Sequence, residues 1–283
     1  MSENPKLSII TVNLNNRDGL QRTIDSVVSQ TFTDYEWIII DGGSTDGSRE
    51  LIEQYQDHFA YWCSEPDKGI YNAMNKGIAH TKGEWLQFLN SGDWLYDNAT
   101  LENAFNKNWD CDVLYGNVVH VCNKKNIYIE FPSSVDFYYF INNYINHQAT
   151  FTKSEIFKTH LFNESLRIYA DWELCLNLLF EGKRFEHTNQ YIAYYDFNGM
   201  SSNLTQMHTD EHAMILNKFA DKHIASYLFD VNKVFEDIVL LNNYKEKEKT
   251  LNTHRSYRFI MKLSTKIIII LQRIINILEN NRK

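Results

Sequence analysis

The chain has 283 residues, of which 43% are hydrophobic and 23% charged, and it carries a net charge of −8. These proportions, with only 3 prolines and 11 glycines, exclude disordered, collagen-like and low-complexity chains. The acidic balance argues against a protein that coats nucleic acid, because contact with phosphates needs a broad basic face. The 4 cysteines lack CxxC or CxxH spacing, so we expect neither a zinc site nor a disulfide framework.

The first hundred residues alternate between strand and helix patterns. Short apolar runs predict buried strands at Leu7–Val12, Glu36–Asp41, Ala60–Trp62 and Trp85–Leu89. Helices are predicted between them: one carries Leu20, Ile24, Val27 and Val28, one carries Leu51, Ile52 and Tyr55 behind a cap at Asp46 or Ser48, and one lies near Ile70–His80. This alternation predicts an α/β fold with a mainly parallel sheet flanked by helices. Ligands of such sheets bind beyond the carboxyl ends of the strands, where Asp41 and Asp93 lie.

The alternation weakens in the second half of the chain. Val113–Val121 and Ile127–Phe131 are predicted to form the two strands of a hairpin. A predicted helix places Trp172, Cys175, Leu176, Leu179 and Phe180 on one stripe, with Asp171 at its N-terminus. Residues 199–212 are polar and predict a mobile loop, and the pattern beyond them is helical to the end.

Three aspartates stand where chemistry is expected, and each has a plainer structural alternative. Asp41 precedes the turn GGSTDG, which matches no phosphate-binding motif. Its carboxylate suits a ribose hydroxyl or a base N–H, or else it only caps the turn. Asp93 ends the run Asn90–Asp93 and is either a hard oxygen ligand for Mg²⁺ or Mn²⁺ on a diphosphate, or a turn residue. Asp171 is either a general base held at a helix end or the N-cap of that helix.

Together these segments resemble the family 2 glycosyltransferases of the GT-A fold, the inverting, nucleotide-sugar-dependent enzymes of bacterial polysaccharide assembly. The segments that carry the resemblance are Leu7–Asn16 (LSIITVNLNN), Ser26–Phe32 (SVVSQTF), Glu36–Ser48 (EWIIIDGGSTDGS), Ser64–Ile78 (SEPDKGIYNAMNKGI) and Gly83–Trp94 (GEWLQFLNSGDW). Weaker support comes from Asn146–Phe151, Ala170–Leu174 and Asn198–Asn203. The order and spacing of the first five segments are specific as a set.

The resemblance implies a division of the chain and a set of site residues. It implies a GT-A domain over residues 1–220, made of a nucleotide-sugar-binding half at 1–95 and an acceptor-binding half at 96–220, and a helical C-terminal extension at 221–283. The implied nucleotide-sugar-binding residues are Thr11, Asn13, Asp41, Asp67, Lys68, Ser91 and Gly92. Asp93 is implied as the ligand of Mn²⁺ or Mg²⁺, and Asp171 as the catalytic base.

The chain departs from the family pattern at two places. Asn90 and Gly92 stand where acids are common in the metal motif, which leaves a single metal carboxylate at Asp93. Ala170 precedes Asp171 where a Glu-Asp pair is frequent. Other side chains keep two interpretations. His208 and His212 either complete a metal shell or contact the diphosphate, or else they are surface histidines. Trp94 and Trp172 either stack on sugar rings or belong to the core, and His147–Gln148 is a candidate for the acceptor side.

The last segment of the chain differs in charge from the rest. Residues 255–283 hold seven basic residues and one acidic residue, a net charge of +6, which leaves −14 on the first 254. Apolar residues at helical spacing predict a basic amphipathic helix, whose longest apolar run of five residues is too short to span a bilayer. Such a helix suits an anionic membrane surface, or else it packs on the body or on a partner subunit.

The sequence therefore predicts a metal-dependent inverting glycosyltransferase, cytoplasmic and peripheral at the inner face of the membrane. The expected donor is a UDP-sugar, with a GDP-sugar also open, and the expected acceptor is a glycan or lipid-linked glycan that grows into lipopolysaccharide, capsule or exopolysaccharide. Three alternatives remain. They are a nucleotidyltransferase that makes sugar nucleotides, a non-catalytic nucleotide-sugar-binding protein, and a subunit of a polysaccharide synthase complex. The first should have a basic glycine-rich loop after the first strand, and the segment VNLNNRDG matches such a loop poorly.

Overall fold

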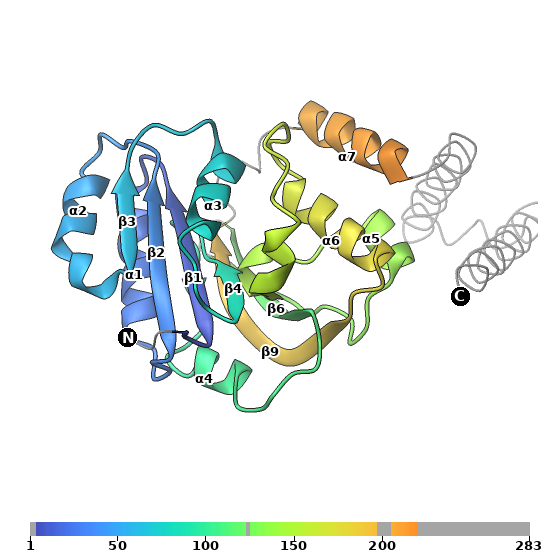
Figure 1. Ribbon diagram of the computed structural model, residues 1–283, viewed down its shortest axis with the longest axis horizontal. Coiled ribbons are helices and arrows are strands. Elements are labelled where there is room, and N and C mark those ends of the chain that lie inside the picture. Colours follow the sequence, from blue (N-terminus) through green and yellow to red (C-terminus); the bar gives the residue numbers. More distant parts are fainter. Residues whose placement is uncertain (1–3, 123–124, 197–204, 220–283) are drawn as a thin grey trace, which may run out of the picture. The chain divides into compact units, whose positions relative to one another are not determined.

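The parallel part of the sheet consists of the four strands that the apolar runs predict. The computed structural model describes residues 4–122, 125–196 and 205–219. The strands are β1 (Leu7–Asn13), β2 (Tyr35–Asp41), β3 (Tyr61–Ser64) and β4 (Trp85–Phe88). They lie in the order β3-β2-β1-β4, and each pairs with its neighbour in parallel (Figure 1). Every residue of β1 is buried, which explains why this strand is apolar on both faces.

Helices cover both faces of these strands. They are α1 (Arg17–Val28), α2 (Ser48–Gln54) with the 3₁₀ turn η1 (Gln56–His58), and α3 (Ile70–Ile78). In Figure 1, α3 lies in front of the parallel strands and α1 behind them. The predicted stripe of α1 is buried at Leu20, Ile24 and Val27, whereas Val28 is 38% exposed.

The predicted cap of α2 needs a correction. The N-cap is Gly47, with φ of 91°, and neither Asp46 nor Ser48 holds that position. Asp46, the residue before the N-cap, still satisfies one N–H group of the first turn of α2, because its carboxylate accepts a hydrogen bond of 3.1 Å from the backbone N–H of Ser48.

The second half of the described chain extends the sheet and adds helices. Its strands are β5 (Trp94–Leu95), β6 (Val113–Cys122), β7 (Lys125–Ile129), β8 (Thr150–Lys153) and β9 (Phe185–Asp196). Its helices are α4 (Thr100–Ala104), α5 (Phe137–Asn142), η2 (His147–Ala149), η3 (Ser154–Lys158), α6 (Ala170–Phe180) and α7 (Thr205–Phe219). The predicted hairpin is confirmed, since β6 and β7 pair antiparallel.

The complete sheet of the described residues is mixed. Its nine strands follow the order β3-β2-β1-β4-β8-β6-β9-β5, and β7 pairs with β6 outside this path. β8 runs antiparallel to both β4 and β6, whereas β9 is parallel to β6. The mainly parallel sheet predicted from the first hundred residues is confirmed, and the second half adds antiparallel pairs as well as the parallel pair of β6 with β9. Because β4 pairs with β8, the sheet crosses the predicted boundary at 95/96, and the division into functional halves stays a prediction.

Two expectations for the second half are wrong in part. Residues 205–212 were expected in a loop, but they form the beginning of α7, while 199–204 lie outside the described residues. The buried side of α6 contains Leu174 and Leu178, whereas Phe180 is 36% exposed. The reason is that other segments contact α6 on more than one side: Trp172 donates from Nε1 to the Phe140 carbonyl on α5, and Glu173 pairs with Lys218 on α7.

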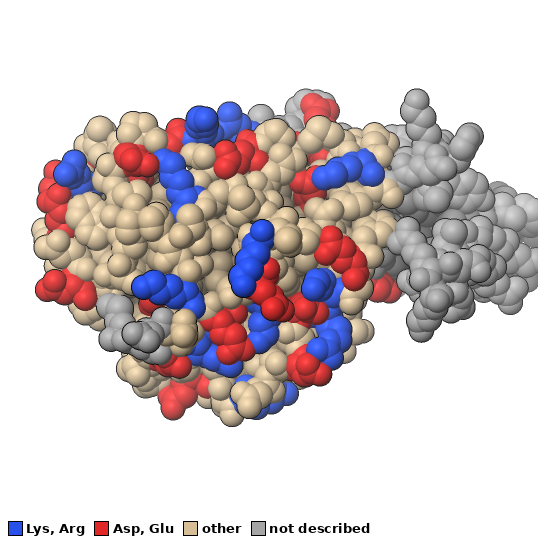
Figure 2. All heavy atoms as spheres, in the orientation of Figure 1, with Lys and Arg blue, Asp and Glu red and all other residues tan. Residues whose placement is uncertain are grey.

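The surface of the described chain carries both signs of charge. On the face shown in Figure 2, Lys and Arg side chains are interspersed with Asp and Glu. Within the described ranges, no helix has the length and apolar character needed to cross a bilayer. The extension at 221–283 and its basic helix at 255–283 lie outside the described residues, so their predicted roles stay predictions.

Candidate functional site

Polar side chains gather at the carboxyl ends of β1, β2 and β3. Strand register places Asn13 beside Asp41 and Asp41 beside Ser64. Asp41 accepts hydrogen bonds from Asn13 Nδ2 at 2.7 Å, Ser44 Oγ at 2.5 Å and Ser64 Oγ at 2.6 Å. We call Asn13, Asp41, Ser44 and Ser64 the strand-end cluster.

The carboxylate of Asp41 is ionised, and both of its oxygens accept hydrogen bonds. Burial by itself would raise its pKa, but the hydrogen bonds from Ser44, Ser64 and Asn13 outweigh burial and lower the pKa. Two backbone N–H groups, of Gly43 and Ser44, also donate to this carboxylate. Asp41 therefore holds the turn that follows β2. Within the described chain, the polar atom of the cluster that is buried without a partner is Asn13 Oδ1.

Two of the other predicted nucleotide residues lie next to the cluster. A Cβ atom added at Gly42 would stand 2.6 Å from Asp67 Oδ2, so the Asp67 carboxylate packs against the turn after Asp41. Its other oxygen accepts from the backbone N–H of Gly69 at 2.8 Å. Lys68 is exposed, and its carbonyl accepts from Arg167 Nη1 at 3.3 Å.

The predicted role of Thr11 in the pocket does not fit its position. Its side chain is completely buried, and its hydroxyl donates to the Leu89 carbonyl at 2.8 Å and accepts from Trp37 Nε1 at 3.0 Å. Thr11 therefore joins β1 to the end of β4 inside the sheet. Ser91 and Gly92 do lie at the sheet edge, where the Ser91 carbonyl accepts from Asn16 Nδ2 at the start of α1.

Asp93 is enclosed by the protein. Its residue exposure is 5%, Oδ2 accepts from Gln148 Nε2 at 3.0 Å, and Oδ1 accepts from the backbone N–H of Asp196 at 3.2 Å. Burial raises its pKa to about 7, against the attraction of His147 and the two hydrogen bonds.

The described side chains do not fit a metal ion at this position. Both oxygens of Asp93 already accept hydrogen bonds, and burial favours the neutral acid, which is a poor metal ligand. Across residues 4–122, 125–196 and 205–219, no three His, Cys, Asp or Glu side chains gather in a way that could hold a metal. The assignment of Asp93 as a metal ligand is therefore not supported by its position.

Asp171 is linked to the end of β4 through an imidazole. His147 Nδ1 lies 2.9 Å from Asp171 Oδ2, and His147 Nε2 lies 3.0 Å from Asn90 Nδ2. Tyr71 donates from its hydroxyl to Asp171 Oδ1 at 3.3 Å. We call Asn90, His147 and Asp171 the imidazole bridge. The alternative of Asp171 as an N-cap is wrong, because the N-cap of α6 is Tyr169 and Asp171 is the second residue of the helix.

Comparison with known proteins identifies the family. The model of glycosyl transferase family 2 matches residues 8–161. A PGL/p-HBAD biosynthesis glycosyltransferase of Mycobacterium bovis is 30% identical over 210 residues, which cover 71% of this chain and 80% of that relative. The chain belongs to glycosyltransferase family 2.

Other family 2 relatives match shorter stretches. An uncharacterized glycosyltransferase of Mycobacterium tuberculosis is 49% identical over 94 residues, or 33% of this chain, and the match spans only 36% of that relative's length. TuaG of Bacillus subtilis, a putative teichuronic acid biosynthesis glycosyltransferase, is 34% identical over 113 residues, which cover 38% of this chain and 44% of the relative.

Solved structures show the fold of this family 2 chain. S. aureus TarS 1–349 in complex with UDP-GlcNAc has a TM-score of 0.60 at 16% identity, covering 78% of this chain and 69% of TarS 1–349. The mannosyltransferase PcManGT from Pyrobaculum calidifontis, in complex with GDP-Man and Mn²⁺, has a TM-score of 0.58 at 14% identity, covering 77% of this chain and 64% of PcManGT. At these identities the likeness concerns the fold alone, and the predicted GT-A fold is confirmed.

The structure settles the position of the side chains that had two interpretations. Trp172 is 4% exposed and stacks on His212 at 4.6 Å, so Trp172 belongs to the core. His212 packs on this ring, and its Nε2 lies 3.3 Å from the Ile141 carbonyl. Trp94 stacks on Tyr194 at 4.9 Å and lies 5.6 Å from the Arg22 guanidinium. Both ring faces of Trp94 therefore have neighbours. The side chain of His208 lies outside the described residues.

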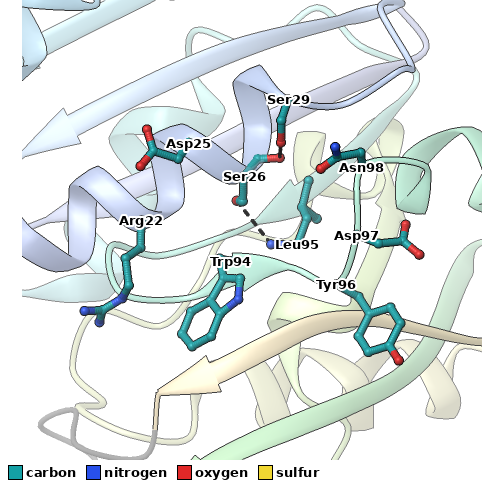
Figure 3. Close-up of a pocket in the computed structure, with 9 residues that line it drawn as sticks. All are labelled: Arg22, Asp25, Ser26, Ser29, Trp94, Leu95, Tyr96, Asp97 and Asn98. Atoms are coloured by element: carbon teal, nitrogen blue, oxygen red, sulfur yellow. Dashed lines mark hydrogen bonds between the residues drawn. The ribbon is translucent and has the colours of Figure 1, made fainter.

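A hollow of about 380 Å³ lies apart from the strand-end cluster and the imidazole bridge. It is lined by Arg22, Asp25, Ser26 and Ser29 of α1 and by residues 94–98 (Figure 3). Trp94, a candidate for stacking on a sugar ring, lines it, whereas none of the nucleotide, metal and catalytic residues implied for this family 2 chain does.

The sequence patterns identified His147–Gln148 as a candidate for the acceptor side but did not reveal the partners of either residue. His147 and Gln148 belong to one short turn, η2, yet the first contacts Asp171 and the second contacts Asp93. The segment Asn146–Phe151 carries the weaker part of the family 2 resemblance and was the available signal. Its role depends on contacts with residues far away in the sequence, which no local pattern reveals.

Proposed function

We propose that this protein transfers a sugar from a nucleoside diphosphate sugar to a hydroxyl group of a growing cell-surface glycan, with inversion at the anomeric carbon. Family membership supports the reaction class, and the names of the relatives, PGL/p-HBAD and teichuronic acid biosynthesis, support a cell-surface product. The observation that carries the proposal is the imidazole bridge. It connects a partly exposed carboxylate, Asp171, to the sheet edge where nucleotide ligands of α/β proteins bind.

The strand-end cluster is the proposed nucleoside site. Asn13 Oδ1 has no partner in the described chain, and the Asp67 carboxylate packs beside the turn that Asp41 holds. Both are acceptors suited to the N–H groups of a base or the hydroxyls of a ribose. A UDP-sugar is the favoured donor, since TarS is solved with UDP-GlcNAc, and a GDP-sugar is the second choice because PcManGT is solved with GDP-Man.

Asp171 is the proposed catalytic base. Its side chain is 24% exposed. Oδ1 accepts from the Tyr71 hydroxyl and from the backbone N–H of Trp172, whereas Oδ2 keeps a lone pair beyond the hydrogen bond from His147. The carboxylate would take the proton of the acceptor hydroxyl as that oxygen bonds to the anomeric carbon. The bond from this carbon to the diphosphate oxygen breaks on the opposite face, so a single displacement inverts the configuration.

Two cations are proposed to offset the charge of the departing diphosphate. Lys68 and Arg167 meet at the loop that carries Asp67, beside the proposed nucleoside site. No step is assigned to a metal, because the position of Asp93 does not fit one.

Donor turnover tests this proposal. Purified protein is incubated with a panel of UDP- and GDP-sugars, with release of nucleoside diphosphate and the anomeric configuration of the product as readouts. We expect Asp171→Asn to lower kcat by about 10²–10⁴-fold, with nucleoside diphosphate binding by calorimetry unchanged. Glu181→Gln, at the exposed C-cap of the same helix, is the matched control and should turn over like the wild type. Wild-type turnover by Asp171→Asn would remove Asp171 from the mechanism.

A non-catalytic nucleotide-sugar-binding protein is the second candidate. The enclosed position of Asp93 favours it, because the carboxylate predicted to bind the metal is 5% exposed and accepts hydrogen bonds from Gln148 and Asp196. Such a protein would bind a nucleotide sugar in calorimetry and release no nucleoside diphosphate with any donor of the panel.

A further inference from the structure

The ring of His147 is held at both nitrogen atoms. Nδ1 faces Asp171 Oδ2 at 2.9 Å, and Nε2 faces Asn90 Nδ2 at 3.0 Å. The turn that carries the ring is fixed from the sheet, because Gln87 Nε2 donates to the Gln148 carbonyl at 2.7 Å. The imidazole is therefore a clamped group, and its position determines where the Asp171 carboxylate lies.

We infer that His147 is a positioning residue, which orients the carboxylate of Asp171 and donates a hydrogen bond to it during proton abstraction from the acceptor. This inference rests on the proposed function. It adds that a hydrogen-bond donor must stand at the position of His147 Nδ1, which does not follow from family membership alone.

The contacts also decide which member of the pair meets the substrate. In a Ser-His-Asp triad the aspartate holds Nδ1 and leaves Nε2 to react. Here Nε2 is occupied by Asn90, while Asp171 is 24% exposed. His147 therefore has no nitrogen left for an acceptor hydroxyl, and Asp171 does have an oxygen.

Asn90 accommodates either protonation state of the ring. When His147 is neutral, Asn90 Nδ2 donates to Nε2. When the ring carries a second proton, the amide turns over and Oδ1 accepts from Nε2–H, and this Oδ1 is buried without a partner in the described chain. In both states Nδ1–H stays on Asp171.

Charged groups around the bridge act on the imidazole, and one of them, Asp93, has a pKa that burial raises to about 7. Burial lowers the pKa of His147, but the hydrogen bond to Asp171 and the charges of Asp171 and Asp93 outweigh burial and raise it. The other titratable groups that face Asp171 are Tyr71, Tyr144, Tyr169 and Cys175, whose pKa values burial raises further above neutral.

Two substitutions separate positioning from mere packing. An asparagine amide at 147 reaches the place of Nδ1, whereas a glutamine amide reaches that of Nε2. We expect His147→Gln to lower kcat by about 10–100-fold, the worth of a hydrogen bond to a charged group, with donor KM within about twofold. His147→Asn should recover most of kcat, because its amide can donate from the place of Nδ1.

The outcomes distinguish this inference from the proposed function. An inactive wild type with every donor would overturn both. The inference alone would be overturned by an active wild type whose His147→Gln variant keeps kcat, or whose Asn and Gln variants lose activity equally. Thermal melting of each variant monitors folding. As a readout without turnover, NMR titration of His147 should show a lower midpoint in Asp171→Asn, and an unchanged midpoint would show that the two groups do not interact.

Discussion

Replacing Asp93 by asparagine should make the protein more stable at alkaline pH. The carboxylate is 5% exposed, and its pKa is raised from 3.8 to about 7 by burial. Asparagine has the same shape and no charge. Gln148 can turn its amide so that Oε1, which is buried without a partner in the described residues, accepts from the new Nδ2.

The magnitude follows from proton linkage. Between pH 4 and 7 the folded protein holds a proton on Asp93 that the unfolded chain has released, so the free energy of unfolding falls as the pH rises. A shift of about three units corresponds to about 4 kcal/mol. This loss of stability is absent below pH 4 and complete above pH 7. Asparagine does not titrate, so the variant should equal the wild type near pH 4 and exceed it by about 4 kcal/mol at pH 8.

Urea unfolding at a series of pH values, in buffer with EDTA, measures this difference. Taking variant minus wild type at each pH cancels the other titrating groups, and comparing this difference between pH 4 and pH 8 also removes any constant packing effect of asparagine. Parallel stability curves for the two proteins would refute the argument that Asp93 is a buried acid. If Mn²⁺ stabilises the wild type and leaves the variant unaffected, Asp93 is a metal ligand after all.

Two further predictions concern stability away from the bridge. The Glu211 carboxylate accepts hydrogen bonds from the three backbone N–H groups of residues 167–169. Glu211→Gln should therefore lower the free energy of unfolding by about 1–3 kcal/mol and speed amide hydrogen exchange at these three residues. The control Glu155→Gln, at an exposed position, should change neither quantity. A Cβ atom at Gly83 would lie 2.5 Å from the backbone of β1, so Gly83→Ala should lower the free energy of unfolding by about 3 kcal/mol. The comparison is Gly182→Ala, where φ is +74° and no atom lies within 4 Å of the added Cβ. There the left-handed backbone alone should cost about 1 kcal/mol. Equal losses at the two glycines would contradict the clash.

The parallel strands β1, β2 and β4 were predictable because they are buried on both faces, whereas β3 is only half-buried. An uninterrupted apolar run such as Trp37–Ile40 marks a strand without any knowledge of its neighbours. β9 escaped prediction for the opposite reason. Its sequence mixes His, Thr and Asn with aromatic residues, and its pairing with β6 shifts register between residues 115 and 118.

The site was predictable as a set of acids and not as a set of contacts. Asp41, Asp93 and Asp171 were all identified as special positions, yet the environment of Asp93 depends on Gln148, 55 residues later, and on Asp196, 103 residues later. A buried acid and an exposed ligand have the same local sequence. Only the fold separates them.

The pairing of β4 with β8 has a consequence for building chimeras of this enzyme family. Residues 146–153 come late in the chain, but β8 is hydrogen-bonded to β4 and η2 is attached to the same strand through Gln87. A chimera joined at residue 95 would take β4 from one protein and residues 146–153 from another, although these two segments are hydrogen-bonded to each other. Acceptor segments exchanged with a relative are therefore best joined after Lys153, so that the native turn stays with its own sheet.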